Sequence, residues 1–242
     1  MTQALHIVVP CYNPHEGWEV QLCNHFSDIK QYLPAYQIHP VVVNDASSTG
    51  IGEEQLQYLH QHLPNVTYIT YPVNHGKGYA LREGIKGIED GLILYTDIDF
   101  PYEYESMVKI VQSLEQGSDI AIGTRDNEYY ENTPLKRKWI SKVLRFVFKV
   151  VFRLPITDTQ CGLKGFNQRG KKVFMSTTIE RFLFDMEFIA IASKTKTVKM
   201  EPVFVVLRSD VVFSKMNLKI LTGEFWNFIK ILRIVRRHQP YE

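Results

Sequence analysis

LILYTDIDFPYE, residues 92–103, places a short apolar run directly before two aspartates that are separated by one residue. The run 92–95 has strand character, Asp97 and Asp99 follow it, and Pro101 stops the pattern. On an extended chain, side chains two residues apart point to the same side, so we expect the two carboxylates to lie close together. Neighbouring carboxylates repel each other unless a cation lies between them. The stretch therefore predicts a buried strand and makes a divalent metal site the first hypothesis for its end. A solvated loop in which Asp99 precedes a helix start at Pro101 is the alternative.

The rest of the first half of the chain alternates strands and helices. Short runs rich in β-branched residues indicate further strands buried on both faces, at 5–10, 39–45, 66–72 and 119–125. Apolar residues at helical spacing predict helices between them, over 18–33, about 77–90 and 107–114. This alternation predicts a doubly wound α/β sheet, mostly parallel with flanking helices, which binds ligands beyond the carboxyl ends of its strands.

Composition narrows the class of protein. A chain of 242 residues, 45% hydrophobic and 22% charged, fits one globular domain with a full core. Three widely spaced cysteines argue against a disulfide framework and indicate a reducing compartment. The N-terminus has no basic region followed by a long apolar run, so no signal peptide is expected. No stretch reaches the roughly 18 apolar residues that a membrane span needs. We therefore expect a cytoplasmic protein.

Charge is distributed unevenly along the chain. Residues 1–133 contain 6 Lys and Arg against 18 Asp and Glu, a net charge of −12. Residues 134–242 contain 22 Lys and Arg against 8 Asp and Glu, a net charge of +14. The second half is therefore expected to meet an anionic partner, and nucleic acid, lipid headgroups and phosphorylated substrates are the candidates.

Two segments of this basic half have the pattern of amphipathic helices. One carries a cationic stripe over 136–153, and the other, over 218–237, has a cationic row formed by Lys230, Arg233 and Arg237. Such helices can lie in a membrane interface, although ordinary helices with solvated charged faces have the same pattern. We divide the chain into a catalytic domain, 1–215, and a basic amphipathic C-terminal helix, 216–242.

Polar residues follow the other predicted strands as well. Asp45 is placed at the tip of the second strand, where it could accept hydrogen bonds from a ribose or a base. The glycines of NHGKG, residues 74–78, permit a close approach of the backbone to a ligand, with Lys77 beside it, but the spacing is not that of a P-loop. Each of these alone would be a turn in most proteins. The first strand also ends in a polar stretch, PCYNPHEGW at 10–18. With Asp97 and Asp99, this makes four polar strand ends along one edge of a sheet, which predict a binding site.

Nine stretches, in order along nearly the whole chain, resemble glycosyltransferase family 2. They are VVPCYNP, VVVNDASS, NHGKGYALREGI, LYTDIDFP, AIGTRD, PLKRKWIS, DTQCGLKGF, FLFDMEF and SK at 214–215. DTQCGLKGF, residues 158–166, discriminates best, because it resembles the dolichyl-phosphate glucose and mannose synthases, the polyprenyl-phosphate branch of the family. The resemblance implies a glycosyltransferase A-type fold, a nucleotide-sugar donor such as UDP-glucose or GDP-mannose, and Mg²⁺ or Mn²⁺ as cofactor.

The resemblance also implies roles for single residues. Five residues would hold the nucleoside or lie beside it: Pro10, Tyr12, Asn13, Asp45 and Lys77. Asp97 would contact the ribose or the metal, and Asp99 would bind the metal. The family usually has Glu directly after Tyr-Asn, whereas Pro14 stands here and Glu16 comes two residues later, which leaves open whether Glu16 takes that role.

Two acceptors have to be distinguished. A lipid phosphate is already anionic near neutral pH and needs only cations to place it. The candidates are Arg125, Arg137, Lys138, Lys164, Arg208 and Lys215. A hydroxyl acceptor on a glycan or glycolipid needs a carboxylate base, for which the candidates are Asp158 and Asp185, with Glu187 nearby. The basic second half favours a polyprenyl phosphate and a single displacement with inversion.

Other classes of protein explain the sequence less completely. A non-catalytic module that binds membranes or nucleic acid would account for the basic half but not for the polar strand ends, and no RNA-recognition motif or zinc-ligand spacing is present. A nucleotidyltransferase would share the fold and the metal but use triphosphates. We therefore expect an enzyme of glycan or cell-wall biosynthesis at the inner face of a membrane. It would be held there peripherally or by a separate anchor subunit, and it would not bind nucleic acid.

Overall fold

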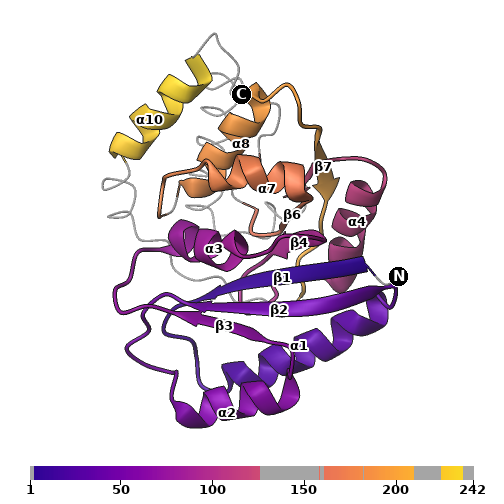
Figure 1. The fold of residues 1–242 in the computed structure, drawn as a ribbon, viewed down its shortest axis with the longest axis vertical. Coiled ribbons are helices and arrows are strands. Elements are labelled where there is room, and N and C mark those ends of the chain that lie inside the picture. The colour runs from indigo at the N-terminus through magenta and orange to yellow at the C-terminus, as the bar shows by residue number, and fades with distance from the viewer. Residues whose placement is uncertain (1–2, 126–157, 159–160, 182, 210–224, 237–242) are drawn as a thin grey trace.

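The computed structural model describes residues 3–125, 158, 161–181, 183–209 and 225–236. Their centre is a seven-stranded sheet with the strand order β3-β2-β1-β4-β6-β5-β7 (Figure 1). The strands are β1 (Gln3–Cys11), β2 (Tyr36–Asn44), β3 (Thr67–Thr70), β4 (Leu92–Tyr95), β5 (Ile120–Thr124), β6 (Lys164–Phe166) and β7 (Met200–Phe204).

The sheet is mostly parallel, as the sequence predicts. β1 runs parallel to β2 and β4, β2 to β3, and β5 to β7, whereas β6 is antiparallel to β4 and β5. Cys11 and Asn44, the last residues of β1 and β2, pair directly, and Tyr95 at the end of β4 pairs with Val8. The loops that follow β2, β1 and β4 therefore leave the same edge of the sheet side by side.

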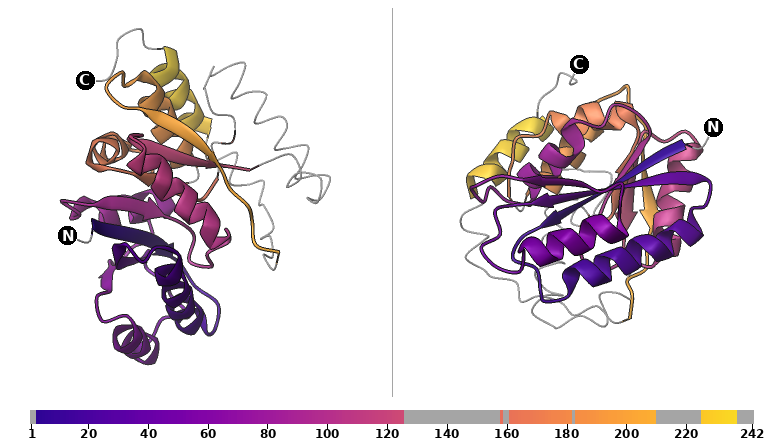
Figure 2. Two further views of the ribbon diagram at one scale, coloured as in Figure 1. Left: turned by 90° about the vertical axis from the view of Figure 1, so that its right-hand side faces the viewer. Right: turned by 60° about the horizontal axis from the view of Figure 1, so that its bottom comes forward.

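Helices cover both faces of the sheet (Figure 2). They are α1 (Trp18–Tyr32), α2 (Glu53–His62), α3 (Lys77–Lys86), α4 (Tyr104–Glu115), α7 (Gln168–Met175), α8 (Phe184–Lys194) and α10 (Phe225–Arg236). Alternate strand residues enter different cores: Val8 packs with apolar residues of α3, α7, α8 and α10, while Ile7 and Val9 pack with those of α1, α2 and α4. Period-two alternation thus buries the central strands on both faces.

Most predicted elements are confirmed, with two differences. The extended chain expected to continue through Asp97 and Asp99 is not observed, because β4 ends at Tyr95. Helix α2 was not expected, because Leu59 is its one buried residue and the apolar period is correspondingly weak. The basic segment 136–153 and the boundary at 215 lie outside the described residues, so both stay predictions.

The C-terminal amphipathic segment is a helix over part of its expected length. α10 packs against α8 and buries Ile231 and Ile234 (Figure 1). In the part of the chain that the structure describes, no helix has the length and apolar character needed to cross a membrane.

Candidate active site

Backbone strain marks the edge of the sheet where the polar loops meet. Asn13, Ala46 and Phe100 are the non-glycine residues with positive φ in the described ranges, at 46°, 56° and 43°. They follow β1, β2 and β4, three neighbouring strands. Such conformations cost about 1–3 kcal/mol each, persist only where the surroundings enforce them, and cluster at functional sites. This edge is therefore the candidate active site.

The loops after β1 and β2 are tied to each other by Asn13. Its side-chain oxygen accepts hydrogen bonds from the amides of Ser48 and Thr49 at 2.8 and 3.2 Å, and its own amide donates to the Ser47 hydroxyl at 2.8 Å. Tyr12 beside it is 54% exposed, and Pro10 is the last but one residue of β1. These residues lie together at the edge of the sheet, and their contact with a nucleoside stays a prediction. Glu16 is exposed nearby.

Asp45 is buried and organises the following loop. Only 3% of the residue is exposed. Its two oxygens accept hydrogen bonds from the Tyr71 hydroxyl and the His75 amide at 2.9 Å, from Asn74 Nδ2 at 2.7 Å and from the Gly76 amide at 2.8 Å. Asp45 therefore fixes the loop that carries Lys77, and its contact with a nucleoside stays a prediction.

Lys77 joins that loop to the end of β4. Its Nζ lies 2.5 Å from Asp97 Oδ1. Burial alone would lower the pKa of Lys77, but the charges of Asp97 and Asp185 outweigh it, so the pKa lies above its ordinary value. The first amides of α3, those of Gly78 and Tyr79, donate to the Glu180 carbonyl. Because these amides already have a partner, the positive charge at this point of the site comes from the Lys77 side chain and not from the N-terminus of α3.

The two aspartates lie in a turn and not on an extended strand, which corrects the expectation from sequence. The Phe100 amide donates to the Asp97 carbonyl at 3.0 Å and closes this turn. Asp99 is exposed on it, yet partial burial of its carboxyl group and the charge of Asp97 raise its pKa. The charge of Asp97 thus acts on Asp99, and a turn rather than an extended strand brings the two residues together.

This turn fits a hard divalent cation. Carboxylate oxygens are the ligands that Mg²⁺ and Mn²⁺ prefer, and a cation would relieve the repulsion that raises the pKa of Asp99. No group of three His, Cys, Asp or Glu side chains suited to a metal occurs among the described residues. An ion held by Asp97 and Asp99 would therefore take its other oxygens from the substrate and from water.

Gly162 is a site residue to which the sequence analysis gave no role. A Cβ atom at this position would come within 2.5 Å of Asp97 Oδ2. The Gly162 amide also donates to the Tyr102 hydroxyl at 3.0 Å. The glycine of DTQCGLKGF thus permits the backbone to press against the Asp97 carboxylate, and the motif itself was the signal that could have revealed it.

Arg125 and Asp158 were expected in separate roles and are paired with each other. Arg125 Nε and Nη2 donate to Asp158 Oδ2 and Oδ1 at 2.9 and 2.7 Å, and the Arg125 amide donates to Oδ2 at 2.8 Å. Although burial lowers it, the pKa of Arg125 is raised well above its ordinary value by this carboxylate. The other predicted phosphate ligands, Arg137, Lys138 and Lys215, lie outside the described residues.

Asp185 belongs to a buried network beneath the site. It is 4% exposed, and its Oδ1 accepts hydrogen bonds from Lys164 Nζ at 2.7 Å and from the Tyr95 hydroxyl at 2.5 Å. Lys164, fully buried, also donates to the Cys161 carbonyl at 2.5 Å. Glu187, the third candidate base, is buried and accepts the amides of Thr178 and Ile179. Lys164, expected as a cation for the acceptor phosphate, is instead buried in this ion pair with Asp185.

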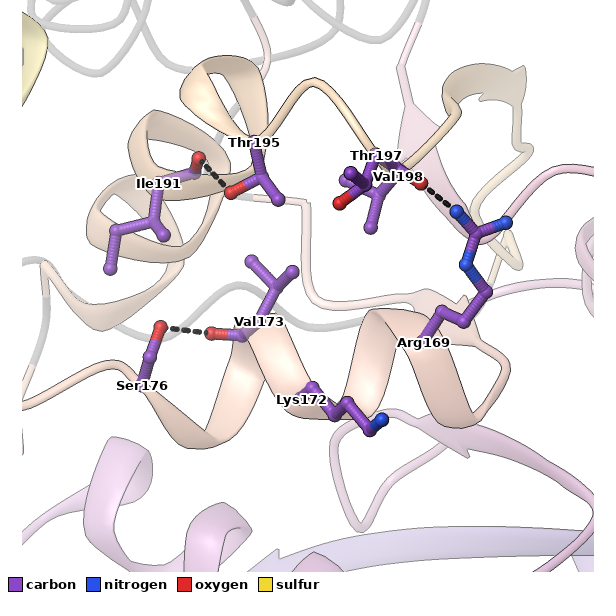
Figure 3. A pocket seen from close by; sticks show the side chains of 8 residues that line it. All are labelled: Arg169, Lys172, Val173, Ser176, Ile191, Thr195, Thr197 and Val198. Carbon is purple, nitrogen blue, oxygen red and sulfur yellow. Dashed lines mark hydrogen bonds between the residues drawn. The ribbon is translucent and has the colours of Figure 1, made fainter. Parts of the chain in front are cut away.

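A cavity of about 260 Å³ lies elsewhere, between α7, α8 and the loop that follows α8 (Figure 3). Its lining consists of Arg169, Lys172, Val173, Ser176, Ile191, Thr195, Thr197 and Val198. None of the predicted site residues is among them, so the candidate active site rests on the strand ends and not on this cavity.

Comparison with known proteins agrees with this geometry. Residues 6–174 match the family model described as Glycosyl transferase family 2. The chain belongs to this family.

Two solved structures are similar in fold over almost the whole chain. Mannosyl-3-phosphoglycerate synthase from Rubrobacter xylanophilus is 13% identical with a TM-score of 0.65, over 97% of this chain and 74% of that one. A mannosyltransferase from Pyrobaculum calidifontis, in complex with GDP-Man and Mn²⁺, is 14% identical with a TM-score of 0.65, over 100% and 66%. The expected glycosyltransferase A-type fold is confirmed.

Curated relatives place this family 2 chain near one branch. A dolichyl-phosphate beta-glucosyltransferase of Trichomonas vaginalis is 31% identical over 78% of this chain and 61% of its own length. The human dolichyl-phosphate beta-glucosyltransferase is 28% identical over 79% of this chain and 63% of its own length. The chain thus spans about three fifths of the length of these relatives. The resemblance stated from the sequence is confirmed at the level of the family and of this branch.

Proposed function

We propose that the protein transfers a hexose, with glucose as the first candidate, from a nucleotide sugar to a polyprenyl phosphate with inversion at the anomeric carbon. The names of the curated relatives support this reaction, and the Mn²⁺ and GDP-Man of a structural neighbour support a metal-dependent nucleotide-sugar donor. The choice of a phosphate over a hydroxyl acceptor rests on the hydrogen bonds and burial of the candidate general bases.

The carboxylates considered as general bases are engaged in structural contacts. Asp158 accepts three hydrogen bonds from Arg125, and Asp185 is buried against Lys164. A general base has to reach the proton that it removes, within a hydrogen bond or through one water. A phosphate monoester has its second pKa near about 6 and is a nucleophile without such a base. A lipid phosphate therefore suits this site better than a hydroxyl acceptor.

In the proposed reaction, the residues at the strand ends have different roles. The loops held by Asn13 and Asp45 would receive the nucleoside at the edge of β1 and β2. When bound, the divalent ion would neutralise charge that develops on the departing nucleoside diphosphate. Lys77 holds the Asp97 carboxylate in place, and Arg125, positioned by Asp158, presents a cation on the β5 side of the site. The acceptor oxygen would then attack from the side opposite the departing group.

Peripheral binding to a membrane belongs to the same proposal, because the acceptor is a lipid. On α10, Trp226 is 75% exposed, and Arg233 and Arg236 are exposed as well. A tryptophan with arginines is the pattern of a helix that lies in the headgroup region of anionic lipids. Lys230, expected in the same cationic row, instead lies 3.4 Å from Glu187 and fastens α10 to α8.

A transfer assay tests the proposed reaction. The protein would be incubated with labelled UDP-glucose or GDP-mannose, Mn²⁺, and either a polyprenyl phosphate or the corresponding polyprenol in detergent. We expect a labelled phosphate-linked product from one donor and the polyprenyl phosphate, with release of the nucleoside diphosphate, and none from the polyprenol. Transfer to the hydroxyl of the polyprenol at a comparable rate would contradict the phosphate acceptor.

A further inference from the structure

Phe100 closes the turn that carries both aspartates. It directly follows Asp99 and has a φ of 43°, which a side chain of its size rarely adopts. Its ring is fully buried, and its amide donates to the Asp97 carbonyl. Because this strained residue joins the turn to the core, the groups that hold its ring also determine where Asp99 lies.

His25 of α1 lies flat against that ring. The two ring centroids are 4.9 Å apart and the planes differ by 15°, while Phe26 meets the Phe100 ring edge-on at 5.4 Å. The imidazole is itself oriented, because its Nδ1 lies 2.8 Å from the Tyr104 hydroxyl, which donates to Asp28 at 3.1 Å. The support of the turn therefore reaches back to a helix 75 residues earlier in the chain.

Arg208 connects this cluster to Pro101, the residue that follows Phe100. Its Nη1 is 3.2 Å from His25 Nδ1, and its amide donates to the Pro101 carbonyl at 3.0 Å. His25 thus contacts both the ring of Phe100 and a side chain whose own backbone is hydrogen-bonded to the residue after Phe100.

We propose that His25 is a positioning residue of the active site, which acts through its stack on Phe100 to hold the Asp97–Asp99 turn in the geometry that binds the metal and the donor. The inference rests on the proposed function, since it assumes that the donor is bound at this turn. It adds a residue on the far side of the sheet from α3, outside every motif of the family resemblance.

Two apolar substitutions of His25 distinguish an effect of ring stacking on Phe100 from an effect of filling the same volume. His25→Leu keeps apolar volume without a flat ring, and His25→Phe keeps the ring without its nitrogens. His39→Leu is the matched control, because His39 stacks on His6 with the same centroid distance, 4.9 Å. These two residues pair within β1 and β2, away from the carboxyl ends of the strands where the candidate site lies. Binding of UDP-glucose and of GDP-mannose would be measured by calorimetry with and without Mn²⁺, together with the melting temperature.

We expect His25→Leu to weaken the Mn²⁺-dependent binding by about 10- to 100-fold, the usual effect of losing an outer-shell support. His39→Leu should bind as the wild-type protein does. His25→Phe, which keeps the stacked ring but loses its contact with the Tyr104 hydroxyl, should lose much less affinity than His25→Leu. Should His25→Leu fail to fold, Tyr104→Phe, which loosens the imidazole without opening the core, should show a smaller loss in the same direction.

Other results would contradict the positioning role, the stacking mechanism or the proposed function, and the three cases can be told apart. Wild-type affinity in His25→Leu, or in Tyr104→Phe where that variant replaces it, would overturn the positioning role. An equal loss in His25→Phe would overturn the stack as its cause. A wild-type protein that binds neither donor with Mn²⁺ would contradict the proposed function itself, and this role with it.

Discussion

At the scale of single residues, the two aspartates after β4 occupy different surroundings. Asp97 is held by Lys77 and pressed against Gly162, so its position is fixed before any ligand binds. Asp99 is exposed, and its pKa is raised by partial burial and by Asp97. An ionised carboxylate that is destabilised in the ligand-free protein is the group that gains most when a cation binds.

Replacement of Asp99 by Asn should abolish transfer and stabilise the ligand-free protein at neutral pH. Because the folded-state pKa is raised, ionised Asp99 lowers the free energy of unfolding at pH 7, and Asn removes that cost. The gain should shrink as the pH falls through the folded pKa and vanish below the ordinary value of 3.8, where both states bind the proton. Thermal unfolding of both proteins across pH checks this, and a lower melting temperature of Asp99→Asn at pH 7 would contradict it.

Gly162→Ala should damage catalysis more than folding. The added methyl group must displace the Asp97 carboxylate, from which it would lie 2.5 Å, and small displacements in an active site can lower kcat/KM by about 100-fold. Gly87→Ala is the matched control, because a Cβ atom there meets nothing within 4 Å. Steady-state kinetics of the two variants give the answer. Equal values of kcat/KM would mean that Gly162 does not constrain Asp97.

At the scale of elements, β4, β6 and α8 meet at a buried ion pair. Tyr95, Lys164 and Asp185 come from these three elements, and the Tyr95 hydroxyl and Lys164 Nζ each donate to Asp185 Oδ1 in the core. Removing one partner of such a pair leaves an uncompensated charge, whereas replacing the whole group by apolar residues is often neutral. The contribution of this network to stability can therefore be measured separately from any contribution to the transfer reaction.

Lys164→Met should lower the free energy of unfolding by about 3–5 kcal/mol, since Asp185 loses its partner. The triple variant Lys164→Met, Asp185→Leu, Tyr95→Phe should recover most of this loss in urea denaturation and should keep transfer to a polyprenyl phosphate. A triple variant that folds but no longer transfers would show that Asp185 takes part in the chemistry, as a hydroxyl acceptor requires.

Sequence alone predicts the elements whose signal is local. The strands β1 to β5 and the helices α1, α3 and α4 follow from period and β-branched runs. β6, with three residues, has no period of its own and exists because β4 and β5 flank it. The partners of Asp158 and Asp185 could not be predicted either, since they depend on long-range pairing. The extended geometry expected for 97–99 was wrong, because the Phe100 amide closes a turn there.

At the scale of the whole molecule, the acidic half of the sequence builds most of the donor edge, and the basic half carries α10. Its exposed face holds Trp226, Arg233 and Arg236. If the acceptor is a lipid, this face should bring the protein to the membrane by charge and by interfacial burial of the indole ring.

The variant Trp226→Ala, Arg233→Gln should bind less to vesicles that contain anionic lipid, while its rate with detergent-dispersed acceptor is unchanged. One arginine near such a surface contributes about 1 kcal/mol, so the effect should also weaken with added salt. Lys199→Gln, which removes an exposed cation paired with Glu201 at 3.4 Å, is the control. Equal sedimentation of all proteins with vesicles would exclude this face as the contact.

The most direct test of the account is the position of the metal. Crystals grown with UDP or GDP and Mn²⁺ would be measured for anomalous scattering. We predict a manganese peak within ligand distance, about 2.0–2.2 Å, of an Asp99 carboxylate oxygen and next to the pyrophosphate at the ends of β1, β2 and β4. A nucleotide bound elsewhere, or a manganese peak away from the 97–99 turn, would contradict the account.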